Sequence, residues 1–115
     1  MSDRIYLRVV DIIGSSLCIS LEDGQKVFNE IDPLLKSGQQ ITISFERVTM
    51  LTALFFNVTI GQLYGSFTEE HIYALVKVDG LAKDDVEMLK RVVDNAKRYF
   101  ANAESYDAAW ESVGS

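Results

Sequence analysis

The chain is poor in the residue types that most often carry chemistry. Among its 115 residues there is one cysteine, Cys18, and one histidine, His71. A single cysteine excludes an internal disulfide and a multi-cysteine metal site, and it fits a reducing compartment, so we expect a cytoplasmic protein. An enzyme using Cys18 or His71 would have to bring the pair together from opposite halves of the chain. We therefore expect no enzyme, no catalytic residues, no metal site and no cofactor.

Positive charge is also scarce. The chain has 11 lysines and arginines against 17 acidic residues, which gives a net charge of −6 and a pI near 4.6. The basic residues are scattered along the chain, so the phosphate backbone of a nucleic acid would meet net repulsion. Nucleic acid is therefore not an expected partner.

No stretch of the chain has the composition of a membrane segment. Residues 48–68 are uncharged, but they include threonines, Asn57, Gln62 and two glycines, which favours a buried helix over a membrane span. The first fourteen residues carry Asp3, Arg4, Arg8 and Asp11 and so lack the apolar core of a secretory signal. We expect no membrane association.

Three segments show the two-residue period of β-strands. Residues 4–10 place Ile5, Leu7 and Val9 on one side, and residues 41–46 alternate in the same way. A third, shorter strand is predicted over residues 75–78. The sequence thus predicts about three or four strands.

The remaining periodic segments are helical. A helix is predicted from the cap residue Ser20 to a point before Gly38, with a kink or a restart at Pro33. A short helix should follow Thr68, and a long amphipathic helix should run over residues 82–103. Beyond it the apolar stripe slips to Tyr106, Trp110 and Val113, which predicts a separate tail. We expect a small α/β domain over residues 4–104, with helices packed on a mixed central sheet, and a tail over residues 105–115.

The segment from Thr52 to Tyr64 is predicted to be a helix that is apolar on more than one face. One face would hold Leu51, Leu54, Phe55 and Val58, and the other would hold Phe56, Ile60 and Leu63. Two interpretations are open. Both faces could pack within the domain, or the second face could contact a partner protein or a second copy of the chain.

Gly14, Ser15 and Ser16 form the one candidate ligand-binding turn. They lie between a predicted strand and a predicted helix, where backbone amides can hold an anion. A plain turn is favoured, because the segment lacks the further glycines and the lysine of phosphate-binding loops.

Several stretches resemble a known family. The run ITISFERVTMLTALFFNVTIGQLYG resembles the STAS domains of anti-sigma factor antagonists. The runs GSSLCISLEDGQKVF and VDGLAKDDVEMLKRVVDNAKRYF are similar to STAS-like bacterial proteins of unknown function. The resemblance covers residues 4–101, and it implies a STAS-like fold and a regulatory protein–protein interaction.

In STAS domains the loop entering this helix, and the helix itself, form the docking surface for a partner kinase of the GHKL ATPase type. The resemblance therefore implies a partner-binding set made of Thr49, Thr52, Phe56, Ile60 and Leu63. Anti-sigma factor antagonists have an aspartate followed by a phosphorylated serine at the helix start. Here Thr52 and Ala53 stand in that place. Because alanine cannot accept phosphate, we expect docking without that phosphoswitch.

The sequence thus predicts a non-enzymatic regulatory module that binds a partner protein. The resemblance implies a GHKL-type ATPase as this partner, and a homodimer is the alternative assembly. A sensor for a small ligand or nucleotide and a small enzyme are the competing hypotheses.

Overall fold

The computed structural model describes the backbone of residues 3–114 and the side chains of residues 3–101. Three strands form a parallel sheet in the order β1-β3-β5, with bounds β1 (Ile5–Arg8), β3 (Ile41–Ser44) and β5 (Val76–Asp79). Two short strands, β2 (Leu17–Cys18) and β4 (Met50–Leu51), pair separately, also in parallel. The α/β class is confirmed, and every strand pair of the described chain is parallel.

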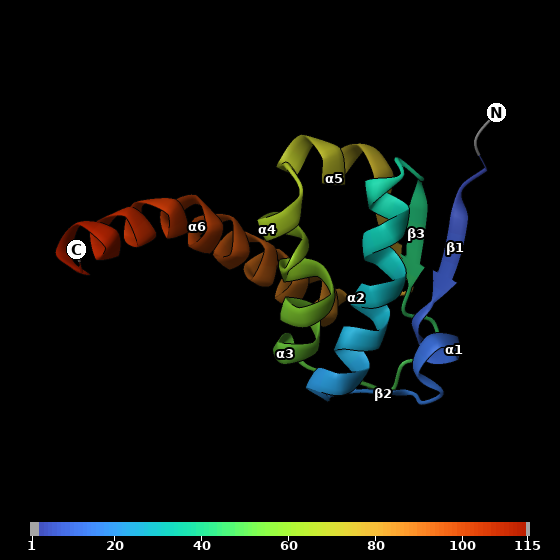
Figure 1. Ribbon diagram of the computed structural model, residues 1–115. Helices are drawn as coiled ribbons and strands as arrows, with labels where there is room; N and C mark the ends of the chain where they lie inside the picture. The colour runs from blue at the N-terminus through green and yellow to red at the C-terminus, as the bar shows by residue number, and fades with distance from the viewer. Residues whose placement is uncertain (1–2, 115) are drawn as a thin grey trace.

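The helices are α1 (Val9–Ile13), α2 (Leu21–Lys36), α3 (Ala53–Phe56), the π-helix η1 (Asn57–Gly61), α4 (Leu63–Ser66), α5 (Glu69–Leu75) and α6 (Lys83–Gly114). Figure 1 shows α2 beside the sheet, with α3, α4 and α6 beyond it on the same side. None of the described helices combines the length and the apolar character needed to cross a bilayer.

The central strand β3 is buried along its whole length. Ile41 and Ile43 belong to the core with residues of α2, and the intervening Thr42 and Ser44 lie on the opposite face of the sheet. On that face the hydroxyl of Tyr6 in β1 donates to Asp79 Oδ2 in β5 at 2.6 Å. The alternation of residues predicted this strand. Its position between β1 and β5 explains why it is buried along its whole length.

The first predicted strand is too long. Residues 9 and 10 belong to α1, whose Val9 is buried. Gly14 ends this helix with φ 70° and donates its amide N–H to Val10 O at 2.8 Å. A glycine in the left-handed conformation is a common helix end. Val9 and Val10 are therefore helical here, although valine favours strands.

Helix α2 begins where the sequence predicts. The Ser20 side chain accepts a hydrogen bond from the amide of Asp23 at 3.1 Å, and the helix ends at Lys36. It runs through Pro33 without the predicted restart. Pro33 is exposed and lies in the last turn, so its missing N–H interrupts only the end of the helix.

The segment predicted as a helix over residues 52–64 is divided into α3, η1 and α4, and Leu51 belongs to β4 instead. Helix α2 contacts η1, and α6 contacts it as well. Phe56 and Leu63 are fully buried and Ile60 is 4% exposed. The placement of these three side chains on a partner-binding face is therefore corrected: they pack inside the domain, whereas Leu54 of the other predicted face is exposed.

Helix α6 is longer than predicted and continues to Gly114 without a break at Ala103. Val92 and Ala96 are buried, and the ring of Phe100 lies against Gly65 of α4. Figure 1 shows the C-terminal part of α6 projecting beyond the other elements. The side chains of the predicted tail, residues 105–115, lie outside the described part.

Candidate functional site

The two residues considered for catalysis, Cys18 and His71, lie far from each other, and each makes contacts that stabilise the fold. Cys18 is fully buried, and burial, with a smaller contribution from Asp23, raises the pKa of its thiol to about 12. His71 Nε2 lies 2.9 Å from Leu35 O, and the ring stacks on Phe67. Cys18 precedes the start of α2 and Leu35 lies near its end, a separation of about 20 Å along this helix. The structure does not bring this pair together.

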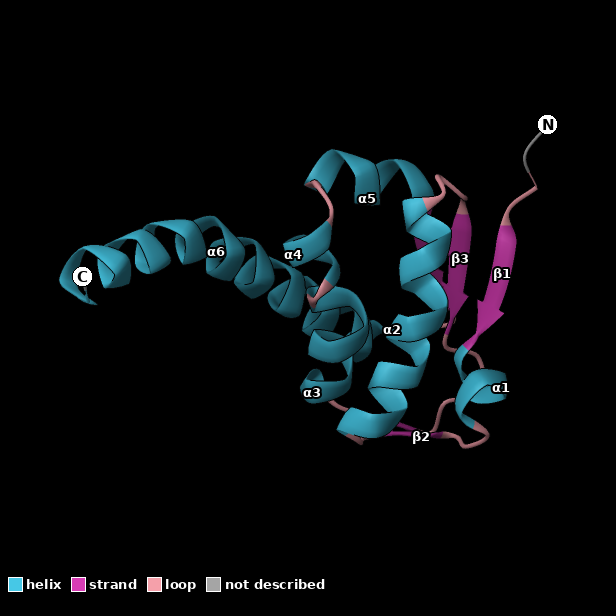
Figure 2. Ribbon diagram, in the orientation of Figure 1, coloured by secondary structure: helices cyan, strands magenta, loops and turns pink. Residues whose placement is uncertain are grey.

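The two candidate segments around residues 14–16 and 49–52 do meet. Leu17 pairs with Met50 in the β2–β4 ribbon. The Thr49 amide donates to Ser16 O at 2.9 Å, and the hydroxyls of Thr49 and Ser16 are also 2.9 Å apart. Figure 2 shows this ribbon at one end of the molecule, below α1 and next to the start of α2. It lies beyond the carboxyl ends of β1 and β3, the edge where parallel sheets commonly place their sites.

Thr52 connects the ribbon to the helix that follows. Its Oγ1 accepts from the amide of Phe55 at 3.3 Å, which caps α3, and the same hydroxyl donates to Cys18 O at 3.4 Å. Its backbone amide donates to Cys18 O at 3.2 Å. The side chain of Thr52 is half-buried and is engaged within the chain.

The outer side of this region is an apolar surface, which we call the ribbon surface. It consists of Leu17 (43% exposed), Ile19 (40%), Leu21 (59%), Met50 (54%) and Leu54 (47%). Five of the nine large hydrophobic side chains that are exposed in the described chain thus come from β2, the residues between β2 and α2, β4 and the first turns of α2 and α3. Single exposed hydrophobic residues are ordinary, but a cluster of them marks an interaction site.

Sequence reasoning did not identify most of this surface. Leu54 was assigned to a helix face and Leu21 to the apolar pattern of the helix after Ser20, and the other three residues were not singled out. Leu17, Cys18 and Ile19 do alternate, with the buried Cys18 between two exposed neighbours. In the sequence all three residues are hydrophobic, so no alternation of polar and apolar side chains indicates a strand here.

The turn at Gly14, Ser15 and Ser16 gains no support as an anion site. The amide of Gly14 is bonded to Val10 O, and the amide of Leu17 donates to Ser15 Oγ at 3.0 Å. Ser16 is engaged by Thr49. The amides of Gly14 and Leu17 are therefore already used by the fold, and Ser16 accepts hydrogen bonds from Thr49.

Comparison with known proteins gives one match. A family model described as a STAS-like domain of unknown function matches residues 23–86, from the first turn of α2 to the first turn of α6. No curated protein and no solved structure matches the chain.

Proposed function

The chain belongs to the family of STAS-like domains of unknown function, and we propose that it is a regulatory module that binds a partner protein through the ribbon surface. The observation that carries this proposal is the gathering of Leu17, Met50 and their three neighbours, all exposed, at one end of the domain. Burying such side chains against a partner is favourable by roughly 25 cal/mol for each Å² of apolar surface.

The ribbon surface lies at the loop that enters α3, which is the place where the STAS resemblance implies docking. Thr49 is exposed beside Met50, and its hydroxyl is hydrogen-bonded to Ser16 Oγ at this end of the domain. Phe56, Ile60 and Leu63 then contribute indirectly, because their burial holds α3 and η1 in place. A GHKL-type ATPase is the partner class that the resemblance suggests.

The charge around the surface suggests the character of the partner. Leu21 is followed by Glu22 and Asp23 in the first turn of α2, and Asp23 is paired with Lys26 at 3.5 Å. A partner with an apolar centre and basic residues on that side would complement this arrangement.

The proposed role is non-enzymatic and cytoplasmic. The thiol of Cys18 is buried with a raised pKa, which disfavours the thiolate that acts as nucleophile. A buried free thiol is also suited to a reducing compartment.

Affinity capture from the native host, followed by direct binding measurements, tests the proposal. Leu21→Ser and Met50→Ser should each weaken binding of the captured partner by about fivefold or more, because truncating an apolar side chain at the centre of an interface costs about 1 kcal/mol or more of binding free energy. Tyr73→Ser is the matched control, since Tyr73 is 69% exposed on α5, outside the ribbon surface.

Equal binding by wild type and both ribbon variants would refute the proposal. A second copy of the chain is the alternative occupant of this surface. If sedimentation shows that the wild type is a dimer and that Met50→Ser disrupts it, then the ribbon surface serves self-association and not a different protein.

A further inference from the structure

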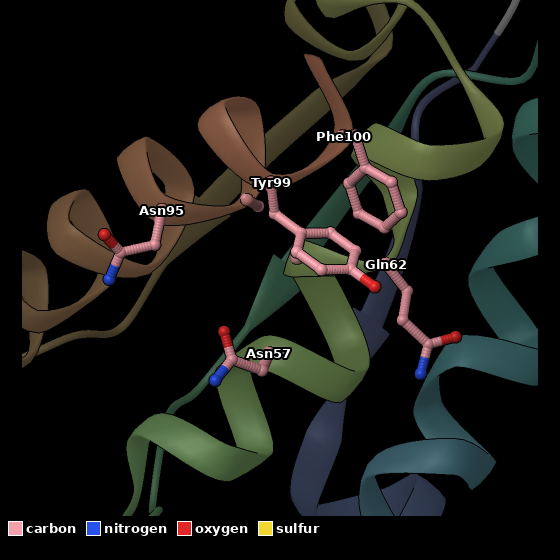
Figure 3. Close-up of a pocket in the computed structure, with 7 residues that line it drawn as sticks. Asn57, Gln62, Asn95, Tyr99 and Phe100 are labelled. Atoms are coloured by element: carbon pink, nitrogen blue, oxygen red, sulfur yellow. The ribbon is translucent and has the colours of Figure 1, made fainter. Parts of the chain in front are cut away.

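A second candidate site lies away from the ribbon surface, between η1 and α6. A cavity of about 290 Å³ opens there, and Figure 3 shows the side chains around it. It is lined by Asn57, Gly61 and Gln62 on one side and by Asn95, Tyr99 and Phe100 on the other. This volume is close to the lower end of the range for small-molecule sites.

Gly61 leaves this cavity open although neither its backbone nor its packing requires glycine. A Cβ at this position would lie 3.5 Å from Asn57 Oδ1 and 3.8 Å from Ala96 Cβ, both ordinary contacts. Glycine is unfavourable within a helix relative to alanine. The nearby Gly65 differs, because a Cβ there would lie 2.5 Å from the ring of Phe100. The missing side chain at Gly61 therefore serves the cavity.

The backbone around Gly61 is also unusual. Residues 57–61 form a π-helix, and such turns are rare and frequent at functional sites. This turn brings Asn57 and Gly61 to the same wall of the cavity. The π-helical backbone and the glycine at position 61 are thus two separate observations that concern the same wall of the cavity.

The polar groups of the cavity have complementary roles. Asn57 Oδ1 lies beside Gly61 and offers an acceptor. The oxygen of Asn95 accepts a hydrogen bond from Arg98 at 3.4 Å, and the amide nitrogen of the same side chain offers a donor. An acceptor on one wall and a donor on the other match the C=O and N–H pattern of an amide group.

The remaining walls are aromatic and uncharged. Tyr99 and Phe100 pack edge to face, with ring centroids 4.9 Å apart. Tyr99 stands over the cavity between Asn57 and Phe100 (Figure 3). The described residues that line it include no acidic or basic side chain. A flat neutral molecule fits such walls better than a charged one.

We propose that this cavity binds a small, flat, neutral molecule whose edge carries an amide, either a carboxamide or a ring lactam. The ring of the ligand would lie against Tyr99 and Phe100, and its amide would meet Asn57 and Asn95. This site shares no residue with the ribbon surface, so it does not depend on the protein-docking proposal.

Titration of the full chain with benzamide, followed by two-dimensional NMR of the backbone amides, tests the proposal. A probe of this size should bind with a Kd on the order of 1 mM and shift the signals of residues 57–62 and 95–100. Benzoate has the same shape but carries a negative charge and lacks the N–H donor. It should shift these signals far less.

Gly61→Ala should keep the thermal melt of the wild type or raise it, while weakening benzamide binding by about tenfold, since its methyl group enters the cavity. Asn57→Ala should also weaken binding, and because Asn57 is exposed, it provides a variant that preserves the fold. Asn29→Ala, at an exposed asparagine on α2, is the matched control and should bind as wild type does.

Three results would overturn the proposal: no shifts with benzamide, shifts that map elsewhere, or an equal response to benzoate. Unchanged binding by folded Gly61→Ala and Asn57→Ala would do the same.

Discussion

At the scale of single residues, Thr52 shows how a predicted contact residue acts within the fold. Its hydroxyl both caps α3 and reaches Cys18 O in β2, so one side chain connects two segments distant in sequence. The position that corresponds to the regulated helix start of anti-sigma factor antagonists thus has a structural role here. Any effect of Thr52 on partner binding has to be separated from its effect on stability.

Thr52→Ala should destabilise the domain by about 1 kcal/mol, because the first turn of α3 loses its cap. Thr52→Ser, which keeps the hydroxyl, is the control and should melt close to wild type. Thermal unfolding followed by circular dichroism measures both. Thr52→Glu should also lose stability, and it should weaken partner binding beyond the loss seen for Thr52→Ala, since it adds a charge beside an apolar surface. Equal melting of Thr52→Ala and wild type would show that the cap is dispensable.

Cys18 makes the stability of the fold depend on alkaline pH. Its thiol is buried with a pKa of about 12, above the ordinary value of 9.0, so the folded state holds the proton more tightly than the unfolded state. The resulting stabilisation is complete below pH 9 and is lost as the pH rises from about 9 to about 12.

We therefore expect the free energy of unfolding of wild type to fall more steeply over this range than that of Cys18→Ala, as measured by urea titration at several pH values. The comparison with Cys18→Ala removes the contribution of tyrosines and lysines that titrate in the same range. Parallel pH profiles of the two proteins would contradict the buried, protonated thiol.

At the scale of elements, two glycines at the ends of α1 and β5 have the same backbone conformation but different surroundings. Gly14 has φ 70° and Gly80 has φ 77°. A Cβ on Gly14 would meet nothing within 4 Å, whereas a Cβ on Gly80 would lie 2.6 Å from the amide nitrogen of Glu46. The turn after β5 is therefore packed directly against the backbone that follows β3.

Gly14→Ala should lower the free energy of unfolding by about 1 kcal/mol, because alanine is unfavourable in the left-handed conformation. Gly80→Ala should lower the free energy of unfolding by at least about 2 kcal/mol, because a steric clash with the backbone after β3 adds to the penalty for the positive φ. Chemical denaturation of both variants measures the difference. Equal losses would show that the loop after β3 moves aside freely.

At the scale of the whole molecule, α6 divides into a part that packs on the domain and a part that projects from it. Contacts with the core include Val92, Ala96 and Phe100, and Figure 1 shows the helix continuing past the other elements. The ribbon surface is formed by β2, the residues between β2 and α2, β4 and the first turns of α2 and α3. Partner docking there would leave α6 free for other contacts.

Truncation after Ala101 should therefore change the melting temperature by only a few degrees, since every buried side chain described on α6 is retained. Differential scanning calorimetry of the truncated and full chains checks this. A large fall in melting temperature would place side chains of the removed segment in the core. A change in self-association with an unchanged melt would give the projecting part of α6 a role in assembly.

The sequence by itself determined the features that depend on residues within about four positions of one another. The caps at Ser20 and Thr68, the strand beginning at Ile41 and the long helix after residue 82 were all predicted correctly. Caps and periodic stripes are local, so they can be identified before any packing is known.

Only the tertiary structure decided what is buried and what is exposed at the candidate site. The ribbon joins residues 33 positions apart, as in the contact of Thr49 with Ser16. Its strands are only two residues long, so no local sequence pattern predicts them. Phe56 and Leu63 have the same apolar character as Met50 and Leu54. The first pair is enclosed by neighbouring elements and the second is not, because α2 and α6 pack against η1 while nothing in the described chain covers the ribbon surface.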